Sequence, residues 1–161
     1  MGRGGGLTAE SPANHLADPS EEECRGLLIS HIHDDFWSDD YYRAAQAVRG
    51  WRDQHREEGS ALLFRRMEHL EELPEAERKR VVEVNAGRRL IKSCFRKTQQ
   101  LCVRGFLSEE DLREHLTMPQ RLKTLFEIIE PFEAARKTDY DREMFDFYDA
   151  LHGGELDRPS R

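Results

Sequence analysis

The spacing of apolar and polar residues predicts one long helix near the middle of the chain. Between residues 78 and 106 there is no proline, and apolar or small residues recur in alternating steps of three and four. These steps keep them on one side of an α-helix, while charged residues occupy the other side. The set comprises Val84, Gly87, Ile91, Cys94, Thr98, Leu101 and Gly105. We expect a central helix over about residues 76–105, with the other helices packed around it.

Similar patterns, bounded by capping residues, glycines and prolines, predict shorter helices on both sides. Asp18 is the expected N-cap of the first, and Tyr41, Ala44, Ala45, Val48 and Trp51 form the expected buried side of the second. Four of the shorter helices are expected at about 19–36, 38–58, 62–70 and 108–116. A fifth begins at Pro119 and is interrupted at Pro131, and the last covers 140–151. This predicts an all-α fold, a single irregular bundle of about six or seven helices over residues 18–153, with flexible tails at 1–17 and 154–161.

Composition supports a helical protein of the cytoplasm. Leu outnumbers Val and Ile combined, charged residues make up 35%, and the net charge is −7. That charge argues against attraction of the whole surface to nucleic acid or anionic lipid. No apolar run approaches the roughly 20 residues that span a bilayer. Cys94 and Cys102 lie about 12 Å apart on one helix, which is too far for a disulfide, so reduced cysteines are expected.

The segment around His31, His33 and Asp35 resembles part of the zinc motif of the metallo-β-lactamase fold. On a strand these side chains could share a metal ion, because alternate residues face the same way. On a helix, residues two apart point about 200° apart and cannot. The apolar spacing favours a helix, so we expect no metal and no cofactor. A metal-dependent hydrolase at this motif remains the second alternative function.

A basic stripe on the central helix is the more general binding candidate. Arg78, Arg89, Lys92 and Arg96 lie within about 60° of one another around the helix axis. They could bind phosphates, an acidic partner or a nucleic-acid backbone. The competing interpretation is neutralisation by the many acids of residues 18–40, which we favour because charged helix faces are common. Few aromatic residues lie among these cations, so nucleic acid is not the expected partner.

Two further features are interpreted as packing. The small residues Gly87, Cys94, Thr98 and Gly105 allow a second helix to approach the central one closely. Cys94 has no histidine in its own stretch to act as a base, so it is not expected to be a nucleophile. The aromatic cluster of Trp37, Tyr41 and Tyr42 could be a recognition corner, but packing at a helix junction is the favoured interpretation.

The later half of the chain resembles an uncharacterised bacterial family of small helical proteins, classed as a domain of unknown function. The likeness covers about residues 80–151, with a weaker match over 24–55. It rests on a long helix ending in the turn 101–107 (LCVRGFL), an apolar helix broken at Pro131 and an aromatic closing helix. Many members carry a membrane helix before the soluble part, which this sequence lacks. The resemblance implies a helical fold and supplies no site.

No acid/base pair, phosphate loop or nucleophile motif is readable in the sequence. We therefore expect a non-catalytic protein that acts through protein–protein interaction or regulation. The first alternative is a phosphate- or nucleic-acid-binding module that uses the basic stripe.

Overall fold

The chain is all-α, as predicted. The computed structural model describes residues 20–116 and 119–153, which are helical apart from turns. The helices are α1 (Glu21–Trp37), α2 (Asp39–Gln54), α3 (Ala61–Glu68), α4 (Glu75–Val103), α5 (Glu109–Asp111), α6 (Pro119–Thr124), α7 (Glu130–Arg136) and α8 (Arg142–Leu151). Shorter turns are the 3-10 helix η1 (Leu70–Glu72) and the π-helical turns η2 (Leu112–Leu116) and η3 (Leu125–Ile129). The predicted tails at 1–17 and 154–161 lie outside the described residues.

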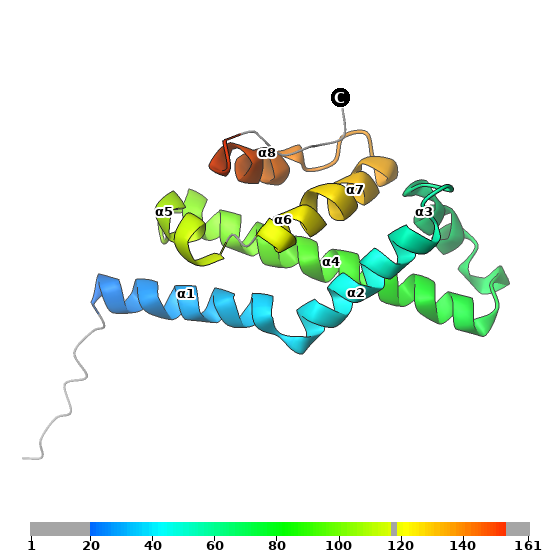
Figure 1. Cartoon of the computed structure of the whole chain (residues 1–161), viewed down its shortest axis with the longest axis horizontal. Coiled ribbons are helices and arrows are strands. Elements are labelled where there is room, and N and C mark those ends of the chain that lie inside the picture. Colours follow the sequence, from blue (N-terminus) through cyan, green and yellow to red (C-terminus); the bar gives the residue numbers. More distant parts are fainter. Residues whose placement is uncertain (1–19, 117–118, 154–161) are drawn as a thin grey trace, which may run out of the picture.

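Helix α4 is the predicted central helix. Its 29 residues begin after Pro74 and end two residues before Gly105, whose φ of 77° closes the helix in the left-handed region that favours glycine. Figure 1 shows α4 running through the molecule with α2 crossing it and with α6, α7 and α8 on another side. The predicted buried face is correct from Val84 to Thr98, but Leu101 is only half-buried and Gly105 is exposed. Gly105 belongs to the turn that ends the helix, so the helical spacing no longer applies there.

The tight crossing predicted at Gly87 is made by α2. A Cβ atom added at Gly87 would lie 3.1 Å from both the Cα and the carbonyl oxygen of Ala44. Glycine therefore lets the two backbones approach each other more closely than any other residue would. All five residues of the predicted apolar side of α2 are buried (Tyr41, Ala44, Ala45, Val48 and Trp51).

The first helix starts at a different cap from the one predicted. Ser20, not Asp18, is the N-cap of α1: its side chain accepts a hydrogen bond from the Glu23 N–H, and the Glu23 carboxylate accepts one from the Ser20 N–H. This reciprocal pair satisfies two free backbone donors. Asp18 itself lies outside the described residues. Ser38, at the predicted start of the second helix, caps α2 by accepting a hydrogen bond from the Tyr41 N–H.

The helical run from Pro119 to Arg136 is interrupted by a π turn. The N–H of Glu130 donates to the carbonyl of Leu125, five residues earlier, immediately before Pro131. Because proline has no N–H to continue the regular ladder, an irregularity beside it is expected. The run contacts α4 through its π turn η3, and its residues Leu122, Leu125 and Ile129 are buried. Helix α8 is attached to α4 by the hydroxyl of Tyr148, which donates to the Phe95 carbonyl over 2.7 Å.

Candidate anion-binding cavity

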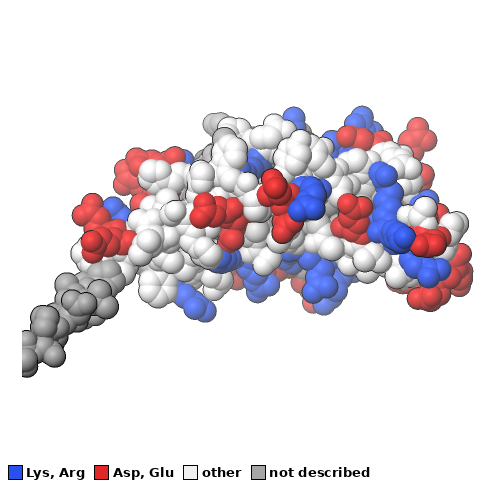
Figure 2. Space-filling view, turned by 90° about the horizontal axis from the view of Figure 1, so that it is seen from below, with Lys and Arg blue, Asp and Glu red and all other residues white. Residues whose placement is uncertain are grey.

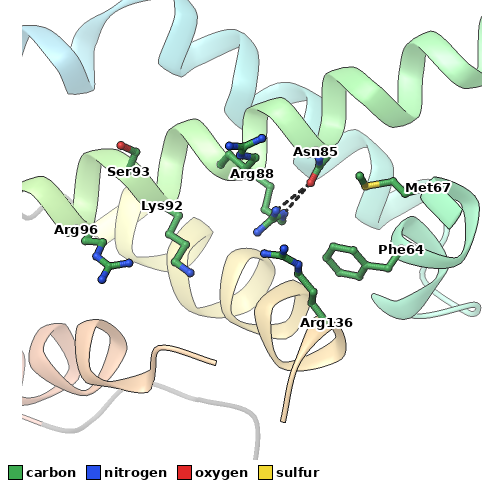
Figure 3. Close-up of a pocket in the computed structure, with 9 residues that line it drawn as sticks. Phe64, Met67, Asn85, Arg88, Lys92, Ser93, Arg96 and Arg136 are labelled. Atoms are coloured by element: carbon green, nitrogen blue, oxygen red, sulfur yellow. Dashed lines mark hydrogen bonds between the residues drawn. The ribbon is translucent and has the colours of Figure 1, made fainter. Parts of the chain in front are cut away.

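A cavity of about 520 Å³ lies between α3, α4 and the end of α7. Figure 3 shows the side chains that surround it. Its lining residues are Phe64 and Met67 from α3, Asn85, Arg88, Arg89, Lys92, Ser93 and Arg96 from α4, and Arg136 from α7. Five of these nine side chains are cationic, and none of the nine is acidic. Volumes of about 300–1,000 Å³ are typical of small-molecule sites.

The regular period of α4 explains why so many cations meet here. From Asn85 to Arg96 the lining residues follow steps of three, one, three, one and three, which keep them on one face over three turns. This face measures about 16 Å along the helix at 1.5 Å per residue. Helix α3 contributes Phe64 and Met67 at the Asn85 end of this face, and α7 contributes Arg136.

Two of the cations are held in place by one buried acid. Glu133 on α7 is only 3% exposed and forms ion pairs with both Arg88 and Lys92. The Lys92 ammonium lies 2.6 Å from Glu133 Oε2, and the other carboxylate oxygen accepts from Arg88 Nη1. Asn85 Oδ1 accepts two further bonds from Arg88, from Nε over 3.2 Å and from Nη2 over 2.9 Å. This network fixes the direction of Arg88 at the wall of the cavity.

The remaining cations are less well balanced. Arg96 lies 3.3 Å from the Asp141 carboxylate, and this pair is partly exposed. Among the described residues, Arg89 and Arg136 form no ion pair within 4.0 Å. Five cations facing two acids leave a local excess of three positive charges in a chain of net charge −7. Such an excess of positive charge attracts anions. Solvent screens this charge less in a recess than it would on an open surface.

Mutual repulsion and burial act on the protonation of this cluster. Burial, followed by the charges of Arg136 and Arg89, lowers the pKa of Arg88 to about 10. Burial is also the largest cause of the lowered pKa of Lys92; the charge of Asp141 raises it, while Arg88, Arg96 and Arg136 lower it further. Arg88 stays protonated at neutral pH. An anion in the cavity would relieve the repulsion among these groups.

One end of the cavity is apolar. Figure 3 places Phe64 and Met67 at the end opposite Arg96, with Arg136 close to Phe64. The Arg88 guanidinium lies 5.5 Å from the centre of the Phe64 ring, within the range of a cation–π contact. The site therefore combines a cationic wall with an apolar end formed by an aromatic ring and a thioether. This combination suits a ligand that has both an anionic part and an apolar part.

The structure brings together three of the four residues of the predicted stripe. Arg89, Lys92 and Arg96 line the cavity, whereas Arg78 lies outside it and donates to the carbonyls of Leu73 and Glu71 over 3.3 and 3.5 Å. The other six lining residues were not predicted as part of a site: Phe64, Met67, Asn85, Arg88, Ser93 and Arg136. Arg88 carried a readable signal: it lies four residues after Val84 and three before Ile91, which places it on the buried side of α4.

The acids that pair with the stripe are not those expected. Glu133 and Asp141, near the C-terminal end of the chain, pair with Lys92 and Arg96. Among the described residues, the acids of 20–40 pair with α4 only at Lys97, which is next to the stripe and whose ammonium lies 2.6 Å from Asp35. The proposed neutralisation by the first helix is thus wrong for the stripe itself, because α7 and α8 approach this side of α4.

The histidine motif does not converge. His31 and His33 are both exposed on α1, and Asp35 pairs with Lys97. Residues 26–31 form part of this helix, so the strand geometry that the motif requires is absent from this segment. Within residues 20–116 and 119–153, no three His, Cys, Asp or Glu side chains are grouped so that they could hold a metal ion.

The aromatic corner is only partly buried. Tyr41 packs into the core, but Trp37 is 56% exposed and Tyr42 is 65% exposed. The favoured packing interpretation is therefore correct for Tyr41 and wrong for the other two rings. The guanidinium of Arg121, on α6, lies 4.6 Å from the centre of the Trp37 ring and 5.3 Å from that of Phe36.

One face of the molecule is mixed in charge. Figure 2, the view from below, shows acidic and basic side chains interspersed between uncharged areas. Many of the charges pair locally, as do Arg43 with Asp40 and Lys79 with Glu75. In the part of the chain that the structure describes, no helix has the length and apolar character needed to cross a membrane.

Comparison of the chain with protein-family models, with curated proteins and with solved structures finds no match. The resemblance to the uncharacterised bacterial family therefore stays an expectation.

Proposed function

We propose that this protein is a non-catalytic binding protein whose basic cavity receives an anionic group of its ligand. The observation that carries the proposal is the convergence of Arg88, Arg89, Lys92, Arg96 and Arg136 on one recess. Two of them, Arg89 and Arg136, have no ion-pair partner among the described residues. Guanidinium groups bind phosphate or carboxylate through two parallel hydrogen bonds, so these two arginines are the expected anchors.

The first test is a calorimetric titration with pyrophosphate at low salt. We expect saturable binding that weakens as salt rises, because much of the attraction is electrostatic. Arg89→Gln and Arg136→Gln should each weaken binding about tenfold, the equivalent of one lost charge-assisted contact. Arg65→Gln is the matched control, since Arg65 is exposed on α3 and does not line the cavity. Absence of binding at low salt, or equal weakening by Arg65→Gln, would contradict the proposal.

Nucleic acid is a less suitable ligand for this site. The cations are recessed between three helices, and the net charge of the chain is −7. Single-stranded and duplex nucleic acid titrated at the same salt concentrations test this alternative. Binding tighter than that of pyrophosphate, and equally dependent on Arg89 and Arg136, would favour a nucleic-acid-binding module.

Interaction with another protein is supported by a different observation. Exposed Trp37 lies against Arg121, and tryptophan, tyrosine and arginine dominate the binding energy of many protein interfaces. We propose this corner as a second, independent binding surface. Capture of partners from the native host with the wild-type protein and with Trp37→Ala, followed by mass spectrometry, tests it. A partner that is lost with Trp37→Ala supports the surface, and identical partners with both proteins contradict it.

A further inference from the structure

The shape and chemistry of the cavity narrow the class of ligand, provided that the proposed anion binding holds. We infer that the cavity binds a nucleotide, with its phosphates among the cations, Arg136 included, and its base against Phe64 and Met67. The inference rests on the opposite character of the two ends, on their separation and on the planar groups at the apolar end.

The cationic end suits more than one phosphate. Arg89, Lys92 and Arg96 follow one another along a single face of α4 within two helical turns. A single carboxylate could engage only part of this set, whereas a diphosphate presents enough oxygen atoms for all of them.

The other end suits a flat ring. Phe64 is half-buried, lines the cavity and already carries the Arg88 guanidinium at 5.5 Å. Met67, beside it, offers a polarisable thioether that makes favourable contacts with aromatic rings. The Arg88 guanidinium is the second planar group at this end. Bases stack on aromatic rings and on arginine planes, so this end can hold a base without hydrogen bonds that read its identity.

The dimensions agree with this assignment. The lining face of α4 extends about 16 Å from Asn85 to Arg96. A free phosphate or a small carboxylate would fill only a fraction of the 520 Å³ and would leave Phe64 and Met67 without a ligand contact. An elongated molecule with an anionic end and a ring end uses both.

The test compares ADP, pyrophosphate, adenosine and hexyl phosphate by calorimetry in magnesium-free buffer. We expect ADP to bind about tenfold more tightly than pyrophosphate, the usual scale for stacking one base. Adenosine should bind weakly, because it lacks the phosphates. Phe64→Leu should lower the affinity for ADP more than it lowers the affinity for pyrophosphate, so that the advantage of ADP is lost. Leu62→Ile, at a half-buried residue of α3 that does not line the cavity, is the control.

A measurement on the wild-type protein makes the test independent of whether the variant folds. In saturation-transfer NMR, the H2 and H8 protons of ADP should receive saturation, and excess pyrophosphate should abolish it. Equal affinities for ADP and pyrophosphate without transfer to the base would overturn the inference and leave the proposed anion binding intact. Tighter binding of hexyl phosphate than of ADP would also overturn it, in favour of an alkyl ligand. Failure of both pyrophosphate and ADP to bind would overturn both proposals.

Discussion

Arg88 and Glu133 form a buried ion pair that joins α4 to α7, although 45 residues separate them in the sequence. Each residue is only 3% exposed, so neither charge is solvated by bulk water. Removing two charges from water costs several kcal/mol each, and their attraction offsets this cost only when the remaining donors are satisfied. Asn85 and Lys92 supply those additional bonds. The pair thereby fixes the wall of the cavity.

Glu133→Gln should strongly destabilise the protein. The substitution leaves Arg88 and Lys92 buried or half-buried without their shared acid, and breaking a buried pair typically costs about 3–5 kcal/mol. Urea denaturation measures the change in the free energy of unfolding. Glu143→Gln, at an exposed residue of α8, is the control and should change it by less than about 0.5 kcal/mol. A similar small change for Glu133→Gln would mean that the pair does not hold the two helices together.

Gly87→Ala and Gly26→Ala should have opposite effects, although both replace a helical glycine. At Gly26 nothing lies within 4 Å of the added Cβ, so alanine should stabilise the protein by up to about 1 kcal/mol through helix propensity. At Gly87 the Cβ would meet the backbone of Ala44 at 3.1 Å, and such overpacking typically costs about 1–3 kcal/mol. Thermal or urea denaturation compares the two. Stabilisation by Gly87→Ala would show that α2 does not approach α4 so closely.

Much of the fold could be predicted because local patterns and tertiary packing agree. The apolar side of α2, the cap at Ser38 and the stop at Gly105 all follow from residue type and helical period. The start of α1 could not be chosen from the sequence, since Asp18 and Ser20 are both good N-caps. At the end of α4, Gly105 fits the helical spacing of the buried residues. It lies in the turn after the helix, however, where that spacing no longer predicts which residues are buried.

The cavity could be predicted only in part. A single helix contributes Arg89, Lys92 and Arg96, and their common face follows from their spacing. Phe64 and Arg136 come from segments before and after α4, so their approach depends on tertiary packing that no local pattern encodes. The acids that pair with the basic stripe were predicted wrongly for the same reason. Residues 18–40 are rich in carboxylates, but their number does not determine which helix packs against the stripe.

Stability at acid pH should depend on Asp111. The backbone N–H and the hydroxyl of Ser108 donate to its carboxylate over 2.8 Å each and hold its pKa below the ordinary value. Because the folded-state pKa is depressed, the stabilisation is present above the unfolded pKa of about 3.9 and is lost as the pH falls through the folded pKa.

Asp111→Asn tests this dependence. We expect it to reduce the free energy of unfolding at pH 6, with a difference from wild type that shrinks at pH 3. Urea denaturation at the two pH values gives both differences. A difference that is the same at both would contradict a role of the charged carboxylate in this cap.

The three cysteines should differ in reactivity. Burial, followed by the nearby charge of Asp35, raises the pKa of Cys94 to about 11, and burial also raises the pKa of Cys102. Cys24 is exposed on α1. Because the thiolate is the reactive form, Ellman's reagent at pH 8 should label Cys24 first and Cys94 only on unfolding. Peptide mass spectrometry identifies the order, and rapid labelling of Cys94 in folded protein would contradict the packing of α4 described above.

The calorimetric titration of pyrophosphate into wild type, Arg136→Gln and Arg65→Gln tests the central claim most directly. If the recess between α3, α4 and α7 attracts anions, wild type and Arg65→Gln bind with similar affinity, and Arg136→Gln binds about tenfold more weakly. If all three proteins bind alike, or none binds at low salt, the positive charges gathered on α4 and α7 do not form a ligand site.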